Sequence, residues 1–217
     1  MAEPRGHLVK GVEETASECL VAPLGLSVRK DADDARRQLS ARGLADEAPE
    51  RWCPWERRAR VLPPHIGRVA ATIVVLMLRG TLLLWGGGSG AAVGGALIGS
   101  ATIAAMGVVA IVIGLSIIVH ETAHGVVFRA LAPSESAIVI VEGCNAALLR
   151  RALPGYRELL VVCAGPCAPA ILALALVPLG ASSWLIPAVG AVVALGHLAT
   201  LAIPIGDGAN LRAALGR

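Results

Sequence analysis

The sequence predicts an α-helical polytopic membrane protein with about four transmembrane helices and a small membrane-associated β-hairpin between the second and the third. Hydrophobic residues make up 55% of its 217 residues, which is high for a soluble domain. Residues 1–68 hold 12 of the 19 Lys and Arg, whereas residues 80–128 and 158–211 hold none. These stretches without basic residues contain apolar runs of about 20 residues, the length that crosses a bilayer.

Residues 1–68 are assigned to a polar cytosolic extension, because they hold too few apolar residues for a sizeable core. They begin without the apolar segment of a cleaved signal peptide. The pattern over 28–44 predicts a short amphipathic helix with acidic residues first and basic residues later. Trp52 and Trp55, beside several arginines, are typical of an interfacial anchor before the membrane. A solvated basic linker is the equally weighted alternative.

The membrane core is predicted over 69–212, followed by a C-terminal tail at 213–217. Its four spans cover 69–87, 98–132, 159–179 and 183–205. The glycine-rich segment 86–90 is expected to join the first two spans. Arg79 lies inside the first span, so it either pairs within the bundle or the span begins after it.

The distribution of basic residues predicts the topology of these spans. With the N-terminus inside, the outer loops 88–97 and 180–182 hold no Lys or Arg. The inner segments hold nearly all of them, as the positive-inside rule requires. This predicts a multi-pass protein with both termini in the cytosol. Many arginines, alanines and glycines hint at a GC-rich bacterial genome, so the expected location is the bacterial cytoplasmic membrane.

The segment between the second and third spans predicts the hairpin. Residues 137–141 are a strand-like apolar run, residues 142–145 have turn chemistry, and residues 146–149 suit a returning strand. A strand edge that faces a protein cavity at the membrane surface could pair with an extended peptide.

The second span ends with the motif His120-Glu121-Thr122-Ala123-His124. Two histidines four apart lie on one helix face, so both imidazoles can reach one zinc ion. The glutamate between them suits a general base. About 20 uncharged residues precede the motif, which places it in or at the edge of a bilayer. Ionisable residues there are candidates for function.

A catalytic zinc usually has three protein ligands and one open position. Asp207 is the best third ligand, because the fourth span brings it to the inner side between two glycines. Glu158, at the entry of the third span, is interpreted as an interfacial charge. His197 precedes Asp207 by about 15 Å of helix rise, and is interpreted as a polar residue bonded to a neighbouring span.

Three elements in order resemble the site-2 proteases, which are intramembrane zinc metalloproteases. They are the motif at 120–124, Ala164-Gly165-Pro166 in the third span, and Pro204-Ile205-Gly206-Asp207-Gly208. The predicted hairpin is also similar to one in that family. The resemblance covers about residues 69–212.

This resemblance implies that His120, His124 and Asp207 bind one Zn²⁺ and that Glu121 is the catalytic acid/base. The implied substrate is a membrane-anchored protein or peptide, cleaved in or near its transmembrane segment. The chain departs from the family where asparagines are common, at Pro169 and over 199–204. Those asparagines are thought to hold substrate backbone.

Two other classes of function are weighed against a protease. A catalytically inactive zinc-binding membrane scaffold would agree with the missing asparagines, but the intact Glu121 counts against it. A metal transporter needs polar residues through the full bilayer depth, and the outer halves of the last three spans are apolar. A nucleic-acid partner is not expected, because no basic stripe with interleaved aromatic residues is present.

Overall fold

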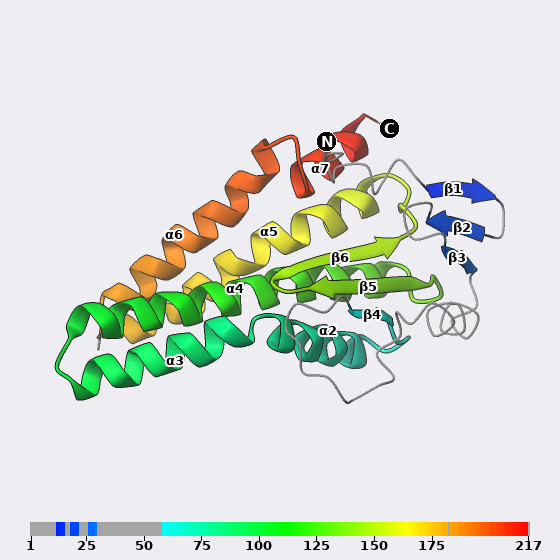
Figure 1. Ribbon diagram of the computed structural model, residues 1–217. Coiled ribbons are helices and arrows are strands. Elements are labelled where there is room, and N and C mark those ends of the chain that lie inside the picture. The colour runs from blue at the N-terminus through cyan, green and yellow to red at the C-terminus, as the bar shows by residue number, and fades with distance from the viewer. Residues whose placement is uncertain (1–11, 16–17, 22–25, 30–57, 182, 217) are drawn as a thin grey trace, which may run out of the picture.

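The computed structural model describes residues 12–15, 18–21, 26–29, 58–181 and 183–216. Long helices lie side by side, and a small sheet lies at one end of them, where the C-terminal helix is also found (Figure 1). The main helices are α2 (Ile66–Gly80), α3 (Leu82–Leu97), α4 (Ala101–Leu131), α5 (Tyr156–Leu176), α6 (Leu185–Ala199) and α7 (Asp207–Leu215).

Three helical segments are long and apolar enough to cross a membrane: α4, α5 with its 3₁₀ extension to Gly180, and α6 with its extension to Ala202. The pair α2 and α3 passes the same test together, although it is bent by 65°. The described part of the chain therefore has three candidate spans, or four if the bent pair is one span. This agrees with the predicted count of about four apolar helices.

The bend between α2 and α3 is at Thr81, which is fully buried. Its hydroxyl donates a hydrogen bond of 2.6 Å to the carbonyl of Met77. The same oxygen accepts one of 3.2 Å from the indole nitrogen of Trp85 in the next turn. Arg79 lies in the last turn of α2, just before the bend. The predicted first span, 69–87, is therefore wrong in its boundaries: its helical region runs from Ile66 to Leu97 and is broken in the middle.

The glycine-rich segment 86–90 is not the predicted loop but part of α3. Two glycines of α3, Gly88 and Gly95, allow α3 and α4 to approach very closely. A Cβ at Gly88 would lie 3.0 Å from the carbonyl oxygen of Gly107, and one at Gly95 would overlap the backbone of Ala104. The chain instead turns at Gly99, where φ is +72°, a conformation that glycine adopts readily.

The sheet near the helix ends has three strands in the order β4-β5-β6. β5 (Ala137–Glu142) and β6 (Asn145–Arg150) form the predicted hairpin, with Glu142 opposite Asn145. β4 (Arg58–Val61), from before the first candidate span, pairs antiparallel with β5. The prediction of a two-stranded hairpin was wrong in strand number, because β4 is only four residues long and half charged.

A second antiparallel sheet, β1-β2-β3, is formed by Val12–Thr15, Glu18–Val21 and Leu26–Arg29. The amphipathic helix predicted over 28–44 is wrong at its first two residues, which lie in β3. Its remainder, and the anchor predicted at Trp52 and Trp55, lie outside the described residues.

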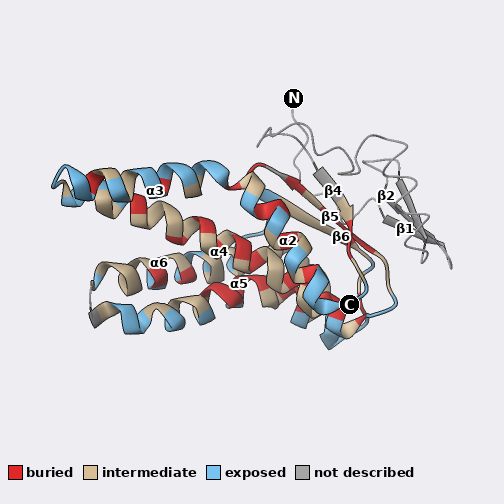
Figure 2. Cartoon of the chain, turned by 90° about the horizontal axis from the view of Figure 1, so that it is seen from below, coloured by how far each residue is buried: buried red, intermediate tan, exposed pale blue. Residues whose placement is uncertain are grey.

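The hydrophobic core lies at the sheet end, where α2, α4, α5 and β5 meet. Figure 2 shows buried residues on these elements and many exposed residues toward the far ends of the helices. The most deeply buried large side chains include Val69, Ile73 and Leu76 of α2, Phe128 of α4, Ile138 of β5 and Val161 of α5. This core packs around the C-terminal half of α4.

Arg129 ties the end of α4 to the segments around it. Its guanidinium is buried and donates to the carbonyls of Pro133 and Glu135, both at 2.8 Å, and of Leu62 at 3.2 Å. The chain entering α2 and the chain leaving α4 are thus joined by one side chain.

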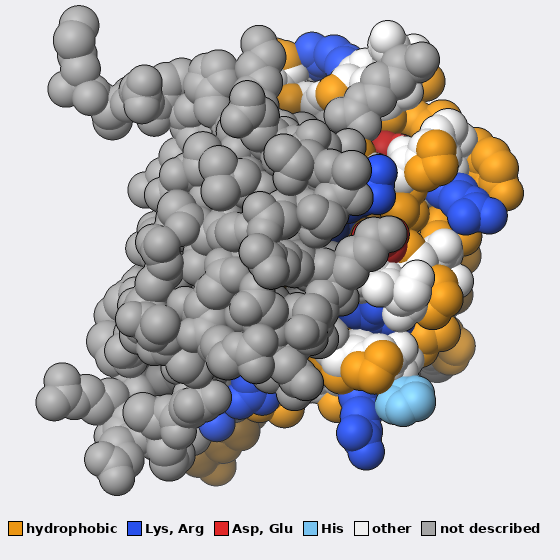
Figure 3. All heavy atoms as spheres, turned by 90° about the vertical axis from the view of Figure 1, so that its right-hand side faces the viewer, with side chains coloured by type: hydrophobic (Ala, Val, Ile, Leu, Met, Phe, Trp, Pro, Cys, Tyr) orange, Lys and Arg blue, Asp and Glu red, His pale blue; other side chains and the backbone are white. Residues whose placement is uncertain are grey.

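Basic residues gather at the sheet end of the molecule. Figure 3 faces this end and shows Lys and Arg side chains around the edge of the undescribed residues. Exposed arginines here come from the first turns of α2 and α5 and from the residue after β6: Arg68, Arg157 and Arg151. The described helices carry no Lys or Arg in α3, α6 and the first 28 residues of α4.

Candidate metal centre

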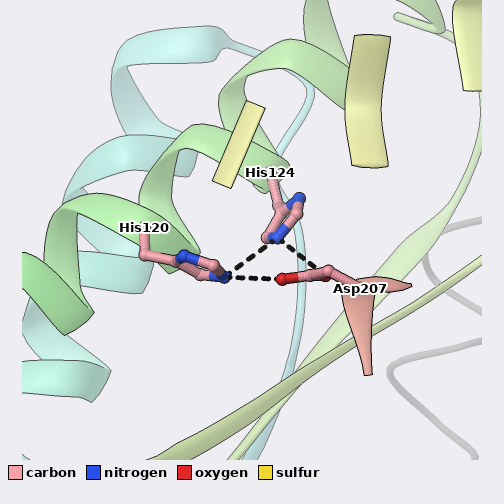
Figure 4. Close-up of side chains that lie close together, drawn as sticks. All are labelled: His120, His124 and Asp207. Atoms are coloured by element: carbon pink, nitrogen blue, oxygen red, sulfur yellow. Dashed lines mark hydrogen bonds and ion pairs between the residues drawn. The ribbon is translucent and has the colours of Figure 1, made fainter. Parts of the chain in front are cut away.

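His120 and His124 lie one turn apart on the buried face of α4, and both are buried. Their Nε2 atoms are 3.3 Å apart. The carboxylate of Asp207 lies opposite both rings, with Oδ2 at 3.1 Å from Nε2 of His120 and Oδ1 at 3.3 Å from Nε2 of His124 (Figure 4). The three residues offer ligand atoms that all lie within 4.8 Å of one another, so they could hold a metal ion.

Asp207 reaches this position because the chain reverses after α6. A short 3₁₀ turn (Thr200–Ala202) is followed by an irregular segment that ends at Gly206, whose φ of +55° favours glycine. Asp207 is then the first residue of α7. Gly208 follows because a Cβ there would overlap the carbonyl oxygen of Ile203. The two glycines that the sequence suggested would loosen the backbone instead allow one tight, defined turn.

His124 is held by α5. Its Nδ1 lies 2.7 Å from the carbonyl oxygen of Val161. A carbonyl can only accept a hydrogen bond, so Nδ1 carries the proton. In the neutral ring Nε2 then has only a lone pair, and this is the atom that faces His120 and Asp207. The backbone of α5 thus selects the tautomer that a metal ligand needs.

Gly165 of α5 makes room for this ring. A Cβ at position 165 would overlap the His124 imidazole at Nε2, Cδ2 and Cε1. The glycine in the Ala164-Gly165-Pro166 element therefore has a steric function at the site. Sequence reasoning identified this element only by resemblance, because the contact joins two helices that are far apart along the chain.

The contact between His124 and Asp207 indicates what the group can hold. An unprotonated Nε2 and a carboxylate oxygen both present lone pairs, and at 3.3 Å they repel each other. A positive charge between them, either a proton or a metal ion, removes this repulsion. With a proton on the facing Nε2 atoms, burial raises the pKa of Asp207, but hydrogen bonds from His120 and His124 lower it by more, so the net pKa lies below the ordinary range of a carboxyl. Asp207 is therefore a charged carboxylate.

Two imidazole nitrogens and one carboxylate oxygen are the donor set of a three-ligand catalytic zinc site. One ligand atom of each residue lies within 4.8 Å of the others, so the residues present fit a divalent metal ion. Glu121 follows His120 in α4 and interacts electrostatically with His124, His120 and Asp207. It is half-buried beside the three residues.

His197 is much closer to this group than its place in the sequence suggested. The interpretation as a polar residue bonded to a neighbouring span is confirmed, because its Nε2 lies 3.2 Å from Oγ of Ser116 in α4. The sequence placed His197 about 15 Å of helix rise from Asp207, which was wrong about its distance from the site. Its ring centroid is 4.8 Å from that of His120, since the reversal after α6 brings Asp207 back beside it.

Glu158 was interpreted as an interfacial charge, and the structure gives it a defined partner. Its two oxygens accept from both terminal nitrogens of Arg150, at 2.7 and 2.9 Å, and one also accepts from the backbone N–H of Leu153. The pair joins the end of β6 to the start of α5, outside the metal-ligand group.

No family model matches the chain, and comparisons with curated proteins and with solved structures find no significant match. The structure shows a mostly helical chain with three or four helices apolar enough to span a membrane, among the residues described. It also has a His-His-Asp group, with both histidines buried and Asp207 half-buried, that could hold a metal ion.

Proposed function

We propose that this protein is an intramembrane zinc metalloprotease of the site-2 protease type. It hydrolyses peptide bonds in or near the transmembrane segment of a membrane-associated substrate. The observation that carries the proposal is the convergence of His120, His124 and Asp207 in the C-terminal half of α4, with Glu121 beside them. The same helix is long and apolar enough to cross a membrane.

Zinc bound by these three residues would lower the pKa of a bound water molecule and polarise the scissile carbonyl. Glu121 is the general base of the proposed reaction. It takes a proton from the attacking water and passes it to the leaving amine. Val161 and Gly165 hold His124 in the orientation and tautomer that this chemistry needs.

The substrate must be locally unwound before it can be cut, because a transmembrane helix shields its own peptide carbonyls. Pairing with the sheet would hold such a segment extended. Among the described strands, β5 is paired on both sides, by β4 and β6, and the outer edge of β6 pairs with none of them. β4 is the other edge strand but has only four residues against six in β6, so β6 is the strand proposed to receive a substrate.

The proposed location is the bacterial cytoplasmic membrane, with both termini in the cytosol. The exposed arginines at the sheet end support this orientation, because cytoplasmic loops carry an excess of basic residues. The metal-ligand group lies toward this end, so the proposed cleavage site is close to the cytosolic face.

The proposal is tested first by the metal content of the purified full-length protein. We expect about one zinc per chain in the wild type and in Glu121→Gln, and a loss or strong weakening of binding in Asp207→Ala. A well-folded wild type that binds no zinc would remove the protease function.

Cleavage is then measured in liposomes that hold the protein and a panel of single-span peptides. The wild type should cut at least one of them, and the zinc-loaded Glu121→Gln variant should cut none. Zinc binding without cleavage of any membrane peptide would favour a zinc-binding scaffold, the second candidate. Metal uptake into the same liposomes would favour a transporter.

A further inference from the structure

Arg150, the last residue of β6, holds the start of α5. Its side chain is only 11% exposed, and its two terminal nitrogens donate to the two oxygens of Glu158 at 2.7 and 2.9 Å. One of these oxygens also accepts from the backbone N–H of Leu153, in the link between β6 and α5. A bidentate pair between a guanidinium and a carboxylate has a defined geometry, so it fixes the first turn of α5 relative to the end of β6.

The first turn of α5 leads directly to the metal-ligand group. Val161 follows Glu158 by three residues, so the two lie one turn apart on one side of the helix. The carbonyl oxygen of Val161 lies 2.7 Å from Nδ1 of His124 and accepts its hydrogen bond. A shift of the first turn would therefore move the carbonyl that orients the His124 ring.

A second contact joins Arg150 to the helix that carries the two histidines. Its guanidinium carbon, Cζ, lies 5.4 Å from the centre of the Phe128 ring, within the range of a cation–π interaction. Phe128 is fully buried and lies four residues after His124, on the same face of α4. Arg150 is thus linked to His124 by two routes, through α5 and through α4, and each route needs only one helical turn.

We infer that Arg150 is a positioning residue of the metal centre. It holds the first turn of α5 and the end of α4 in the relative placement that orients His124 for a metal ion. The inference rests on the proposed function, because it assumes that His124 binds a metal. Arg150 also ends β6, so one side chain holds both the strand proposed to receive a substrate and the surroundings of a metal ligand.

Two other functions of Arg150 fit the geometry less well. Its terminal nitrogens donate to Glu158, and one of them also donates to the carbonyl of Arg151 at 3.1 Å. The guanidinium is therefore engaged within the protein and is not presented to a substrate anion. A purely stabilising ion pair would need no contact with the helix of the metal ligands, yet the guanidinium lies against Phe128.

The test is the zinc affinity of the purified full-length protein, measured by competition with a chromophoric chelator. Arg150→Gln removes the cation and the bidentate pair. We expect its zinc affinity to fall by about 5- to 10-fold, at or below the lower limit of the loss caused by removing a direct partner of a metal ligand. Arg150→Lys keeps a cation near Glu158 and should recover part of this loss.

Two controls separate positioning from charge and from stability. Arg157→Gln removes an exposed arginine next to Glu158 and should bind zinc as the wild type does. Gly95→Ala would overlap the backbone of Ala104 and should destabilise the protein. Ala104 lies in the first turn of α4, far along the helix from the histidines, so the zinc affinity of this variant should stay at the wild-type value.

The absorption spectrum of the cobalt(II)-loaded protein gives a second readout, because its visible bands report the geometry of the ligands. Arg150→Gln should shift these bands, and Arg150→Lys should shift them less. Wild-type affinity and bands in a folded Arg150→Gln, or an equal loss of affinity in Gly95→Ala, would overturn the inference. Circular dichroism shows whether each variant is folded. Where Arg150→Gln does not fold, the bands of Arg150→Lys decide: a shift supports the inference, and wild-type bands overturn it.

The outcomes separate this inference from the proposed function. A wild type that binds no metal would overturn both. A wild type whose zinc affinity depends on Arg150 but that cleaves no peptide would overturn the protease and leave the inference standing. Cleavage together with a zinc affinity that is independent of Arg150 would do the reverse.

Discussion

Gly165 of α5 lies so close to His124 of α4 that the imidazole occupies the space a side chain at position 165 would need. The first prediction follows from this contact. Gly165→Ala should displace the His124 ring and weaken zinc binding by about 10-fold or more, since ligand orientation governs affinity. Chelator competition on the purified variant measures the loss.

The control for this variant is Gly196→Ala in α6, where a Cβ would meet nothing within 4 Å. Both changes place alanine in a helix interior, which by propensity alone stabilises a helix by about 1 kcal/mol. Unchanged zinc binding in Gly165→Ala would mean that the ring can move aside without cost, and the steric interpretation of the Ala-Gly-Pro element would fail.

The second prediction concerns the contact between α3 and α4. Gly95→Ala should destabilise the protein by about 1–3 kcal/mol, because the added methyl group would overlap the backbone of Ala104. Gly94→Ala, one residue earlier, meets nothing within 4 Å and should be neutral or slightly stabilising. Denaturant or thermal unfolding in one detergent compares the pair. Equal stability of the two variants would contradict the close packing of these helices.

The third prediction concerns Arg129. Arg129→Leu removes a buried cation that donates to the carbonyls of Leu62, Pro133 and Glu135. Leaving these acceptors without their charged donor should cost about 3 kcal/mol of unfolding free energy. Arg129→Lys keeps the positive charge, so it should lose less unfolding free energy than Arg129→Leu. It should still be less stable than the wild type, because a lysine ammonium group lacks the planar donor geometry with which the guanidinium reaches all three carbonyls. A leucine variant as stable as the wild type would show that these bonds are not needed.

The fourth prediction concerns the pair formed by Arg150 and Glu158, whose side chains are only 11% and 12% exposed. Glu158→Gln and Arg150→Gln should each destabilise the protein, because each leaves the other charge buried. A double-mutant cycle should show a coupling free energy of at least about 1 kcal/mol. A coupling near zero would mean that the pair is no more than a surface contact.

The sequence predicted the parts of this fold that depend on local pattern. The spacing of His120 and His124 requires only one helix, and the apolar length of α4 requires only composition. The strand-turn-strand pattern over 137–149 was visible in the same way. Asp207 was predicted as the third ligand because the predicted fourth span ends on the same side as the two histidines. The structure places it beside both of them.

The parts that sequence reasoning missed depend on contacts between distant segments. The segment 86–90 has the composition of a loop, but it is helical, and its Gly88 lies directly against α4. β4 is too short and too charged to be recognised until β5 is present as its partner. His197 was judged by helix rise, which fails once the chain turns back at Gly206.

The pairing of β4 with β5 also constrains how the intervening chain could cross a membrane. Two strands that share hydrogen bonds must lie on the same side of a bilayer, so the chain between Val61 and Ala137 must cross an even number of times. If α4 is one crossing, as its length and apolar composition allow, then α2 with α3 is the other. In that arrangement the bent pair is a broken span and not a re-entrant loop. The sheet thus constrains the number of possible membrane crossings without any use of the distribution of charged residues.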